Sequence, residues 1–366
     1  MTTTTNDTTT PEVLKTVAVT KIGKLNDPDA AKRGTVELID MPAQPLGPED
    51  VRIRVAYAGI CGSDPHIAEG FFGPAVPRGL GHELSGIVME LGARANRNGL
   101  RVGDRVAGNF LRFCGTCLEC RDGRQQFCPF AHEYSRPGMA ENLVWHESQV
   151  YKLPDSVSLK EGALLEPTSV ALRIVEKAAI RPGDRVLVCG GGAIGQLVMQ
   201  LAARAGATNL TVSEPIAARR ELALRTGADA AIDPMSEDVA QRVSELTGGR
   251  GFDSVIDVSG ATPVLADLPG YAARGGTVVY GATYPDDFRL PLHLAKVAFS
   301  QELTITGAFV SPYVFPRALN LLPYLQLEEF TSAVFPLEQA VEAFDVHMTG
   351  KYPKVLIQPN VIPGEA

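Results

Sequence analysis

Four cysteines crowd into one short stretch of the chain and offer the chemistry of a metal site. Cys114, Cys117, Cys120 and Cys128 follow the pattern C-x2-C-x2-C-x7-C within FCGTCLECRDGRQQFC. Four thiolates on one loop can surround a tetrahedral zinc ion at about 2.3 Å and leave no ligand position open, so the pattern predicts a structural zinc site. Disulfides or a redox pair are the alternatives. The seven-residue gap does not fit the bacterial spacing of an iron–sulfur cluster.

Three other segments carry residues that can bind a metal in an open site. They are CGSDPH at 61–66, GHE at 81–83 and LLEP at 164–167. Singly each is weak evidence, because an isolated cysteine is usually a small buried apolar residue and an isolated histidine is often a hydrogen-bonded polar one. Together, Cys61, His82 and a glutamate would supply three mixed S, N and O ligands. A catalytic zinc needs such a set, with a fourth position free for substrate.

Two glutamates compete for the third ligand position. Adjacent residues on an extended chain point to opposite sides, so His82 and Glu83 can share a metal only if the backbone bends between them. If it does not bend, Glu83 lies beside the ligands instead of binding the metal itself. Glu166 stands just before Pro167, at the expected start of a helix. Both glutamates therefore remain candidates.

A glycine motif marks a second kind of site. Gly190, Gly192 and Gly195 form G-x-G-x-x-G, with Ala193 and Ile194 between the last two glycines, where the apolar run VLVC meets a helical pattern. Glycine there allows a tight turn and a close approach of the backbone to a pyrophosphate, and the helix N-terminus supplies N–H groups to the phosphates. The motif alone could be a glycine-rich turn, but in this strand–turn–helix setting it predicts dinucleotide binding.

The type of dinucleotide follows from charges at the end of the next strand. Glu214 ends that strand 19 residues after Gly195, where a carboxylate hydrogen-bonds the adenosine ribose hydroxyls and repels a 2′-phosphate. Arg219 and Arg220 follow shortly and could hold such a phosphate, although a solvated helix face is their simpler role. We therefore expect NAD, with NADP as the less favoured alternative.

Composition sets limits on the partners. The chain has 366 residues, of which 45% are hydrophobic, and 34 basic against 42 acidic side chains give a net charge of −8. This charge offers no basic field for nucleic acid. No run approaches about 18 consecutive apolar residues, and the first residues resemble no export signal, so we expect a soluble cytoplasmic protein without a membrane partner.

The pattern of short segments predicts two domains of different class. The Thr-rich residues 1–13 should be a disordered tail. Short β-rich runs, such as VRIRVAYAGI and SGIVMEL, then dominate to about residue 151, and a linker helix is expected at 168–178. Strand-like and helical segments alternate over about 170–310, which favours a doubly wound parallel sheet. The short run KVLIQP at 354–359 could return to the first domain and make it discontinuous in sequence.

Taken together, the motifs GICGSDPH, GHELSGIV, the four-cysteine loop, LLEPTSVAL and VLVCGGGAIG resemble the zinc-containing medium-chain dehydrogenase/reductase superfamily in type and order. The resemblance spans nearly all of residues 14–360. It implies an α/β protein with a GroES-like, mainly β catalytic domain over 14–169 and 311–366. It also implies a Rossmann domain over 170–310, with the active site in the cleft between them. Relatives are commonly homodimers or homotetramers.

The resemblance also implies roles for individual residues. Cys61 and His82 would bind the catalytic zinc, and Glu166 matches a position where polyol-type relatives have a glutamate that ligates the metal directly or through water. Ser63 would take the proton of the substrate hydroxyl, and His66 would pass it to solvent, although His66 could also be an ordinary surface histidine. Asp64, between them, is expected to cap or brace the loop.

The motif combination is closest to sorbitol-type polyol dehydrogenases, so we expect NAD-linked oxidation of a secondary alcohol of a polyol, sugar or diol to a ketone. The small-molecule partner would be an alcohol or, in reverse, a ketone. L-Threonine 3-dehydrogenase-like oxidation of an amino alcohol is the alternative. A non-catalytic binding protein on the same fold is less favoured, because it would have no reason to retain Cys61, Ser63, His82 and Glu166 together. A zinc-ribbon nucleic-acid module would need a basic surface that the cysteine loop does not have.

Overall fold

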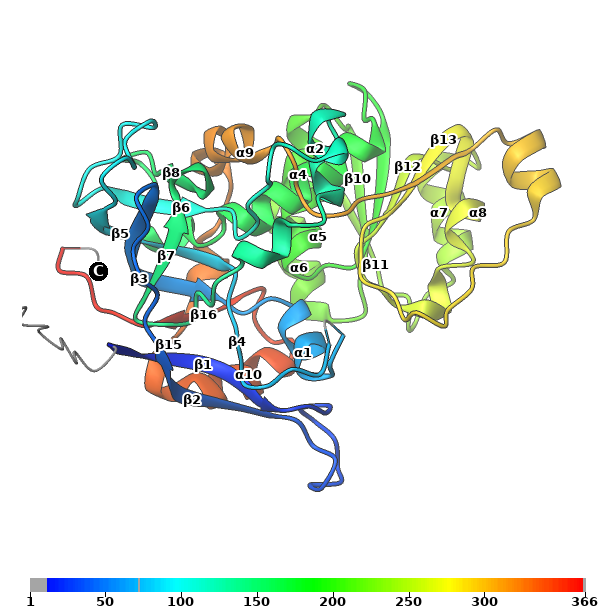
Figure 1. Cartoon of the computed structure of the whole chain (residues 1–366). Coiled ribbons are helices and arrows are strands. Elements are labelled where there is room, and N and C mark those ends of the chain that lie inside the picture. The colour runs from blue at the N-terminus through cyan, green and yellow to red at the C-terminus, as the bar shows by residue number, and fades with distance from the viewer. Residues whose placement is uncertain (1–11, 72, 365–366) are drawn as a thin grey trace, which may run out of the picture.

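The computed structural model describes residues 12–71 and 73–364 and places them in two domains side by side (Figure 1). Of the tail expected over residues 1–13, residues 1–11 lie outside the described residues. The expected end of the tail was wrong, because Val13 already pairs in the first strand. Among the residues that are described, no helix is both long and apolar enough to cross a membrane.

The first domain is built from short strands, as the Val- and Ile-rich runs predicted. Its elements before the linker helix are β1 Val13–Lys21, β2 Thr35–Pro42, β3 Asp50–Gly59, α1 Ser63–Ala68, β4 Arg78–Gly79, β5 Glu83–Leu91, β6 Arg105–Gly108, α2 Leu118–Arg121, β7 Asn142–His146, β8 Val150–Lys152 and α3 Leu159–Gly162. A small sheet has the order β2-β1-β4. The alternating side chains of β1 and β3 bury Val17, Val19, Ile53 and Val55 in one apolar core.

The second domain is a parallel sheet of six strands in the order β11-β10-β9-β12-β13-β14. Its elements are α4 Leu165–Ala178, β9 Arg185–Cys189, α5 Ala193–Arg204, β10 Asn209–Ser213, α6 Ala217–Thr226, β11 Ala230–Ile232, α7 Val239–Thr247, β12 Phe252–Asp257, α8 Leu268–Tyr271, β13 Ala272–Tyr280 and β14 Thr304–Gly307. The strand order reverses between β9 and β12, so dinucleotides are expected at the carboxyl ends of these strands.

The C-terminal segment returns to the first domain. It contains α9 Phe315–Leu321, β15 Ala333–Pro336, α10 Ala340–Met348 and β16 Val355–Gln358. β16 pairs antiparallel with β3 and completes the larger sheet in the order β15-β16-β3-β5-β6-β8, with β7 also paired to β3. The return of KVLIQP to the N-terminal domain is therefore confirmed.

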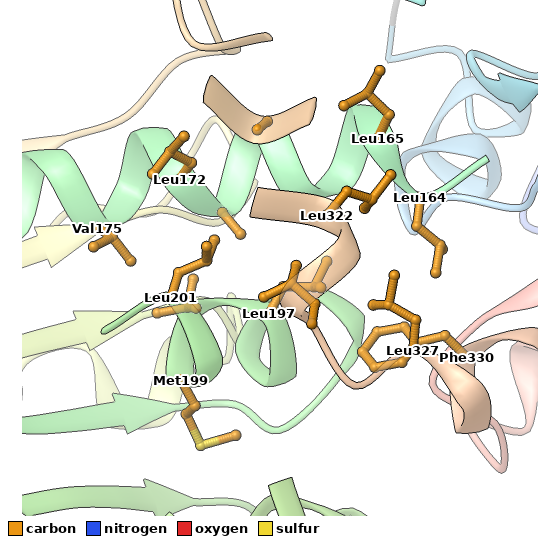
Figure 2. Packing of buried hydrophobic residues seen from close by; sticks show 14 of the residues in the cluster. Leu164, Leu165, Leu172, Val175, Leu197, Met199, Leu201, Leu322, Leu327 and Phe330 are labelled. Atoms are coloured by element: carbon orange, nitrogen blue, oxygen red, sulfur yellow. The ribbon is translucent and has the colours of Figure 1, made fainter. Parts of the chain in front are cut away.

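One apolar cluster joins the two domains. The cluster includes Leu165 and Leu172 of α4. Val175 of α4 points toward Leu201 of α5, and Leu322 of the C-terminal segment lies between the two helices (Figure 2). α4 begins three residues before the expected linker helix. Because Glu166 lies in its first turn, the same buried helix that carries this packing also positions a candidate ligand.

Candidate active site and metal centres

Strand register brings three distant segments to one end of the larger sheet. Gly59, the last residue of β3, lies opposite Glu83 on β5 and opposite Leu356 on β16. The residues just after β3, just before β5 and just before β16 must therefore meet. They are Cys61, His82 and Lys354.

The meeting point has the composition of a metal site. Ligand atoms of Cys61, His82 and Glu83 all lie within 4.8 Å of one another. The backbone therefore does bend enough for neighbouring His82 and Glu83 to reach one place. A thiol, an imidazole and a carboxylate form a donor set that suits zinc, so these residues fit the ion that the motif predicts.

Asp64 orients this group from behind. It is fully buried, and its Oδ2 accepts a hydrogen bond from the backbone N–H of Cys61 at 2.8 Å, which confirms that it braces the loop. Its Oδ1 lies 3.8 Å from Nδ1 of His82 and is a buried oxygen without a hydrogen-bond partner among the described residues. Metal-binding histidines commonly direct their second ring nitrogen at such a carboxylate, which leaves Nε2 for the metal.

Glu83 is held by a buried lysine that the motifs did not reveal. Nζ of Lys354 lies 2.8 and 2.6 Å from the two carboxylate oxygens of Glu83 and also donates to the carbonyl of Ile60 at 3.1 Å. Both side chains are almost fully buried. Burial is the largest single influence and raises the pKa of Glu83. The charges of Lys354 and His82 and the hydrogen bond from Lys354 together outweigh burial, so the pKa lies below its usual range. Glu83 is thus ionised and already paired.

Glu166 lies on the other side of the group, in the first turn of α4, and is buried. Burial raises its carboxyl pKa to about 7, against the lowering influence of His82. The ligand atoms gathered within 4.8 Å do not include its carboxylate in the described structure. A buried carboxyl with a raised pKa is one whose negative charge lacks compensation, and a bound cation would provide that compensation.

Ser63 and His66 both lie on α1, three residues apart and therefore on one side of the helix. The side chain of His66 is 45% exposed, with Nδ1 3.7 Å from a carboxylate oxygen of Glu69. His66 thus has the solvent contact that an outlet for protons needs. The relay itself remains a prediction.

The four-cysteine loop also gathers as predicted. The sulfur atoms of Cys114, Cys117, Cys120 and Cys128 lie within 4.8 Å of one another, and all four are free thiols. Backbone N–H groups point at them: that of Cys117 lies 3.3 Å from Sγ of Cys114, and that of Cys120 lies 3.5 Å from Sγ of Cys117. Hydrogen bonds, first from the Thr116 hydroxyl, lower the pKa of Cys114 to about 6. Convergent thiols with N–H donors fit a closed zinc shell.

The glycine motif forms the turn between β9 and α5. Gly190 has φ +105°, a conformation that side chains rarely adopt. Gly192 caps α5, so the free N–H groups of Ala193 and Ile194 lie in the first turn of that helix. A Cβ at Gly195 would collide with the carbonyl of Gly190, which explains the last glycine. The turn is thus a cradle suited to a pyrophosphate.

Glu214 lies beside this turn, buried just after β10. Its carboxylate accepts hydrogen bonds from the N–H groups of Gly191 at 2.6 Å and Ile216 at 2.9 Å. Nη1 of Arg219 is 3.9 Å away, while Nε and Nη2 of Arg219 donate to the carbonyl of Gly350 in the other domain at 3.1 and 2.8 Å. Arg220 donates to the carbonyls of Glu214 and Pro215. Both arginines are therefore engaged with the protein.

The comparisons with known proteins agree with this geometry. Residues 47–155 match a model of the alcohol dehydrogenase GroES-like domain, and residues 193–323 match a model of zinc-binding dehydrogenases. A 2-dehydro-3-deoxy-L-galactonate 5-dehydrogenase from Pseudoalteromonas atlantica is 36% identical over 81% of this chain and 87% of its own. A D-arabitol-phosphate dehydrogenase from Enterococcus avium is 33% identical over 88% of this chain and 93% of its own.

A solved structure gives the same result. A protein from Sinorhizobium meliloti 1021, described as a zinc-binding dehydrogenase and bound to NADP, superimposes with a TM-score of 0.85 at 29% identity. The alignment covers 95% of this chain and 100% of that one. The chain therefore belongs to the zinc-containing medium-chain dehydrogenase/reductase superfamily, as an oxidoreductase that acts on CH–OH groups with zinc and a nicotinamide cofactor.

Proposed function

We propose that this protein is an NAD-linked dehydrogenase that oxidises a secondary alcohol of a polyol, sugar or diol to a ketone at a zinc ion. The observation that carries the proposal is the meeting of Cys61, His82 and Glu83 within 4.8 Å, from segments that are separate in the chain. A separate four-cysteine group takes the structural role, so the first group is free to serve the reaction.

Two zinc ions per chain are proposed. Cys61 and His82 would hold the catalytic ion, with Glu166 as the third ligand, because Glu83 is already neutralised by Lys354 whereas the charge of Glu166 is not. Glu83 and Lys354 would then lie beside the zinc ion as an ion pair. The structural ion would be held by Cys114, Cys117, Cys120 and Cys128.

NAD is the proposed cofactor. Glu214 lies where a carboxylate can hydrogen-bond the adenosine ribose hydroxyls and repel a 2′-phosphate. Arg219 and Arg220, which could attract that phosphate, are held by Gly350 and by backbone carbonyls. The relative with bound NADP shows that the other cofactor occurs on this fold, so the cofactor preference is a point to measure.

The chain's own residues would fix the charges around the reacting alcohol and carry away its hydroxyl proton. When bound, zinc supplies a Lewis acid for the hydroxyl and the nicotinamide supplies a hydride acceptor. Asp64, whose Oδ1 lies 3.8 Å from Nδ1 of His82, would orient that imidazole, and Lys354 keeps Glu83 ionised. Ser63 would accept the hydroxyl proton, and the half-exposed His66 would pass it to water.

The substrate class follows the relatives in part. The two curated relatives act, by their names, on a deoxy sugar acid and on a sugar-alcohol phosphate. They favour a polyol or sugar, or its ketone in the reverse reaction, and give no support to the threonine alternative.

We also propose a homodimer formed through β14. This strand ends the parallel sheet, so one of its edges has no neighbouring strand in the described structure. Phe299 and Leu294, which precede it, are 88% and 66% exposed. An open strand edge beside exposed apolar side chains is a common site of association. We further propose domain limits close to 14–169, 170–310 and 311–366, with β1 starting one residue earlier and α4 crossing the first boundary. A cytoplasmic location, consistent with six free cysteines, completes the proposal.

Metal analysis and a substrate screen test the proposed reaction together. Two zinc ions per chain and NADH formation from NAD with a panel of polyols, sugars and diols are expected, with threonine as the comparison substrate. A chain with zinc only at the cysteine loop, or one that oxidises threonine and no polyol, would contradict the proposal.

A further inference from the structure

A buried carboxylate at the carboxyl end of β12 ties several loops together. Asp257 is completely buried, and its Oδ1 accepts hydrogen bonds from the backbone N–H of Ser259 at 3.2 Å and its hydroxyl at 2.6 Å. Its Oδ2 accepts from the N–H of Gly260 at 3.3 Å and from the hydroxyl of Tyr284 at 2.7 Å. The hydroxyl of Tyr284 also accepts a hydrogen bond from the N–H of Ala282 at 3.2 Å. Asp257 is therefore linked to the loop after β13 as well.

The loops bound by Asp257 also contact the dinucleotide turn. A Cβ at Gly190 would lie 2.9 Å from the nitrogen of Ser259, so the loop after β12 packs directly on the first glycine of the motif. A Cβ at Gly260 would lie 2.9 Å from the carbonyl oxygen of Thr283, so that loop in turn packs on the loop after β13. Residues 190–192, 258–260 and 281–284 therefore form one continuous wall, which we call the β12–β13 wall.

Strand order shows which part of a dinucleotide this wall would face. Glu214, which marks the adenosine ribose, follows β10, and the pyrophosphate cradle follows β9. β12 and β13 lie on the other side of β9 from β10. A dinucleotide that crosses the carboxyl ends of these strands must therefore place its nicotinamide half over β12 and β13.

We propose that Tyr284, acting through Asp257, is a positioning residue that holds the β12–β13 wall in place for the nicotinamide half of the cofactor. The inference rests on the proposed dinucleotide site and extends it to residues outside the recognised motifs. Tyr284 acts on the cofactor through the loops it joins, and the adenosine half lies on the far side of β9.

The test uses the Tyr284→Phe variant of the full chain, which removes one hydroxyl and keeps the ring. Oδ2 of Asp257 then keeps only the longer hydrogen bond from Gly260. We expect the dissociation constant for NADH, measured by fluorescence titration, to rise about tenfold, which corresponds to the loss of one hydrogen bond to a charged group. Binding of ADP, which lacks the nicotinamide half, should stay within about twofold of wild type.

Tyr280→Phe is the matched control. Tyr280 lies at the end of β13, its ring contacts that of Tyr284 edge-on at 6.1 Å, and its hydroxyl donates to the carbonyl of Leu265 at 3.0 Å. The control therefore loses a tyrosine hydroxyl in the same region without touching Asp257. NADH affinity should change less than about twofold in this control.

Hydrogen exchange on the wild-type protein tests the same point without a variant. NADH should slow exchange at residues 258–260 and 281–284, whereas ADP should not. An unchanged NADH affinity in the Tyr284→Phe variant, equal weakening of NADH and ADP, or equal protection by both ligands would overturn the inference. A wild-type protein that binds neither ligand would instead refute the proposed function.

Discussion

Replacement of Lys354 by methionine tests how the active site is held together. The lysine is 4% exposed and its partner Glu83 is 1% exposed, with 2.6 Å between Nζ and Oε2. Methionine has a similar length and no charge. The Lys354→Met variant would therefore leave the carboxylate of Glu83 buried without its cation.

The expected loss of stability is large for a single substitution. Removal of one partner from a buried ion pair costs about 3–5 kcal/mol, because the remaining charge stays desolvated. For a domain of roughly 150–250 residues, each kcal/mol lowers the melting temperature by about 2–4 °C. The Lys354→Met variant should thus melt about 6–20 °C below wild type.

Thermal unfolding of the zinc-loaded protein measures this difference, with two companion variants. Lys152→Met removes a lysine whose Nζ lies 2.7 Å from Asp104 but whose side chain is 57% exposed, so it should cost less than about 1 kcal/mol. A double variant with Glu83→Gln and Lys354→Met removes both charges and should recover most of the loss. The reasoning about this pair is refuted if the Lys354→Met variant melts within about 2 °C of wild type. It is also refuted if the double variant melts no higher than the Lys354→Met variant.

Three further outcomes follow from the described contacts. Cys128→Ser should lower the zinc content by one ion per chain and reduce the melting temperature, whereas Cys189→Ala, outside the cysteine loop, should keep the full zinc content. Glu214→Ala should shift the ratio of kcat/KM for NAD over NADP toward NADP by about tenfold, the effect of one lost charge-assisted contact, and an unchanged ratio would contradict its role. Burial lowers the pKa of His347 from 6.5 to about 4, so the unfolded chain binds the proton more readily. About 3 kcal/mol of stability, complete above pH 6.5, should therefore be lost as the pH falls toward 4, and His347→Asn should flatten this part of the unfolding profile.

Much of the fold could be predicted because local patterns and tertiary structure agree. The runs at 51–60 and 85–91 correspond to β3 and β5. The glycine motif lies at the junction of β9 and α5, as the strand–turn–helix pattern predicted. The first and last residues of the elements were harder to predict. α4 begins at Leu165, three residues earlier than the apolar spacing indicated. Its first turn contains the buried residues Glu166 and Pro167, which do not follow the apolar pattern of the rest of the helix.

The site could be predicted only where a motif is local. Cys61, His82 and the four-cysteine loop lie within short motifs, and the structure gathers each set. Lys354 could not be found in this way, since it lies 271 residues from its partner Glu83, and only the pairing of β16 with β3 brings them together. The proposed preference for Glu166 over Glu83 as a zinc ligand likewise rests on burial and charge, which sequence spacing does not contain.

Anomalous diffraction at the zinc edge, from crystals grown with NADH, tests the central claim most directly. The account predicts one zinc ion bonded to Sγ of Cys61 at about 2.3 Å and to Nε2 of His82 at about 2.1 Å, and a second ion among the four cysteines. Zinc at the cysteine loop alone, or a metal that contacts only one of Cys61 and His82, would contradict it.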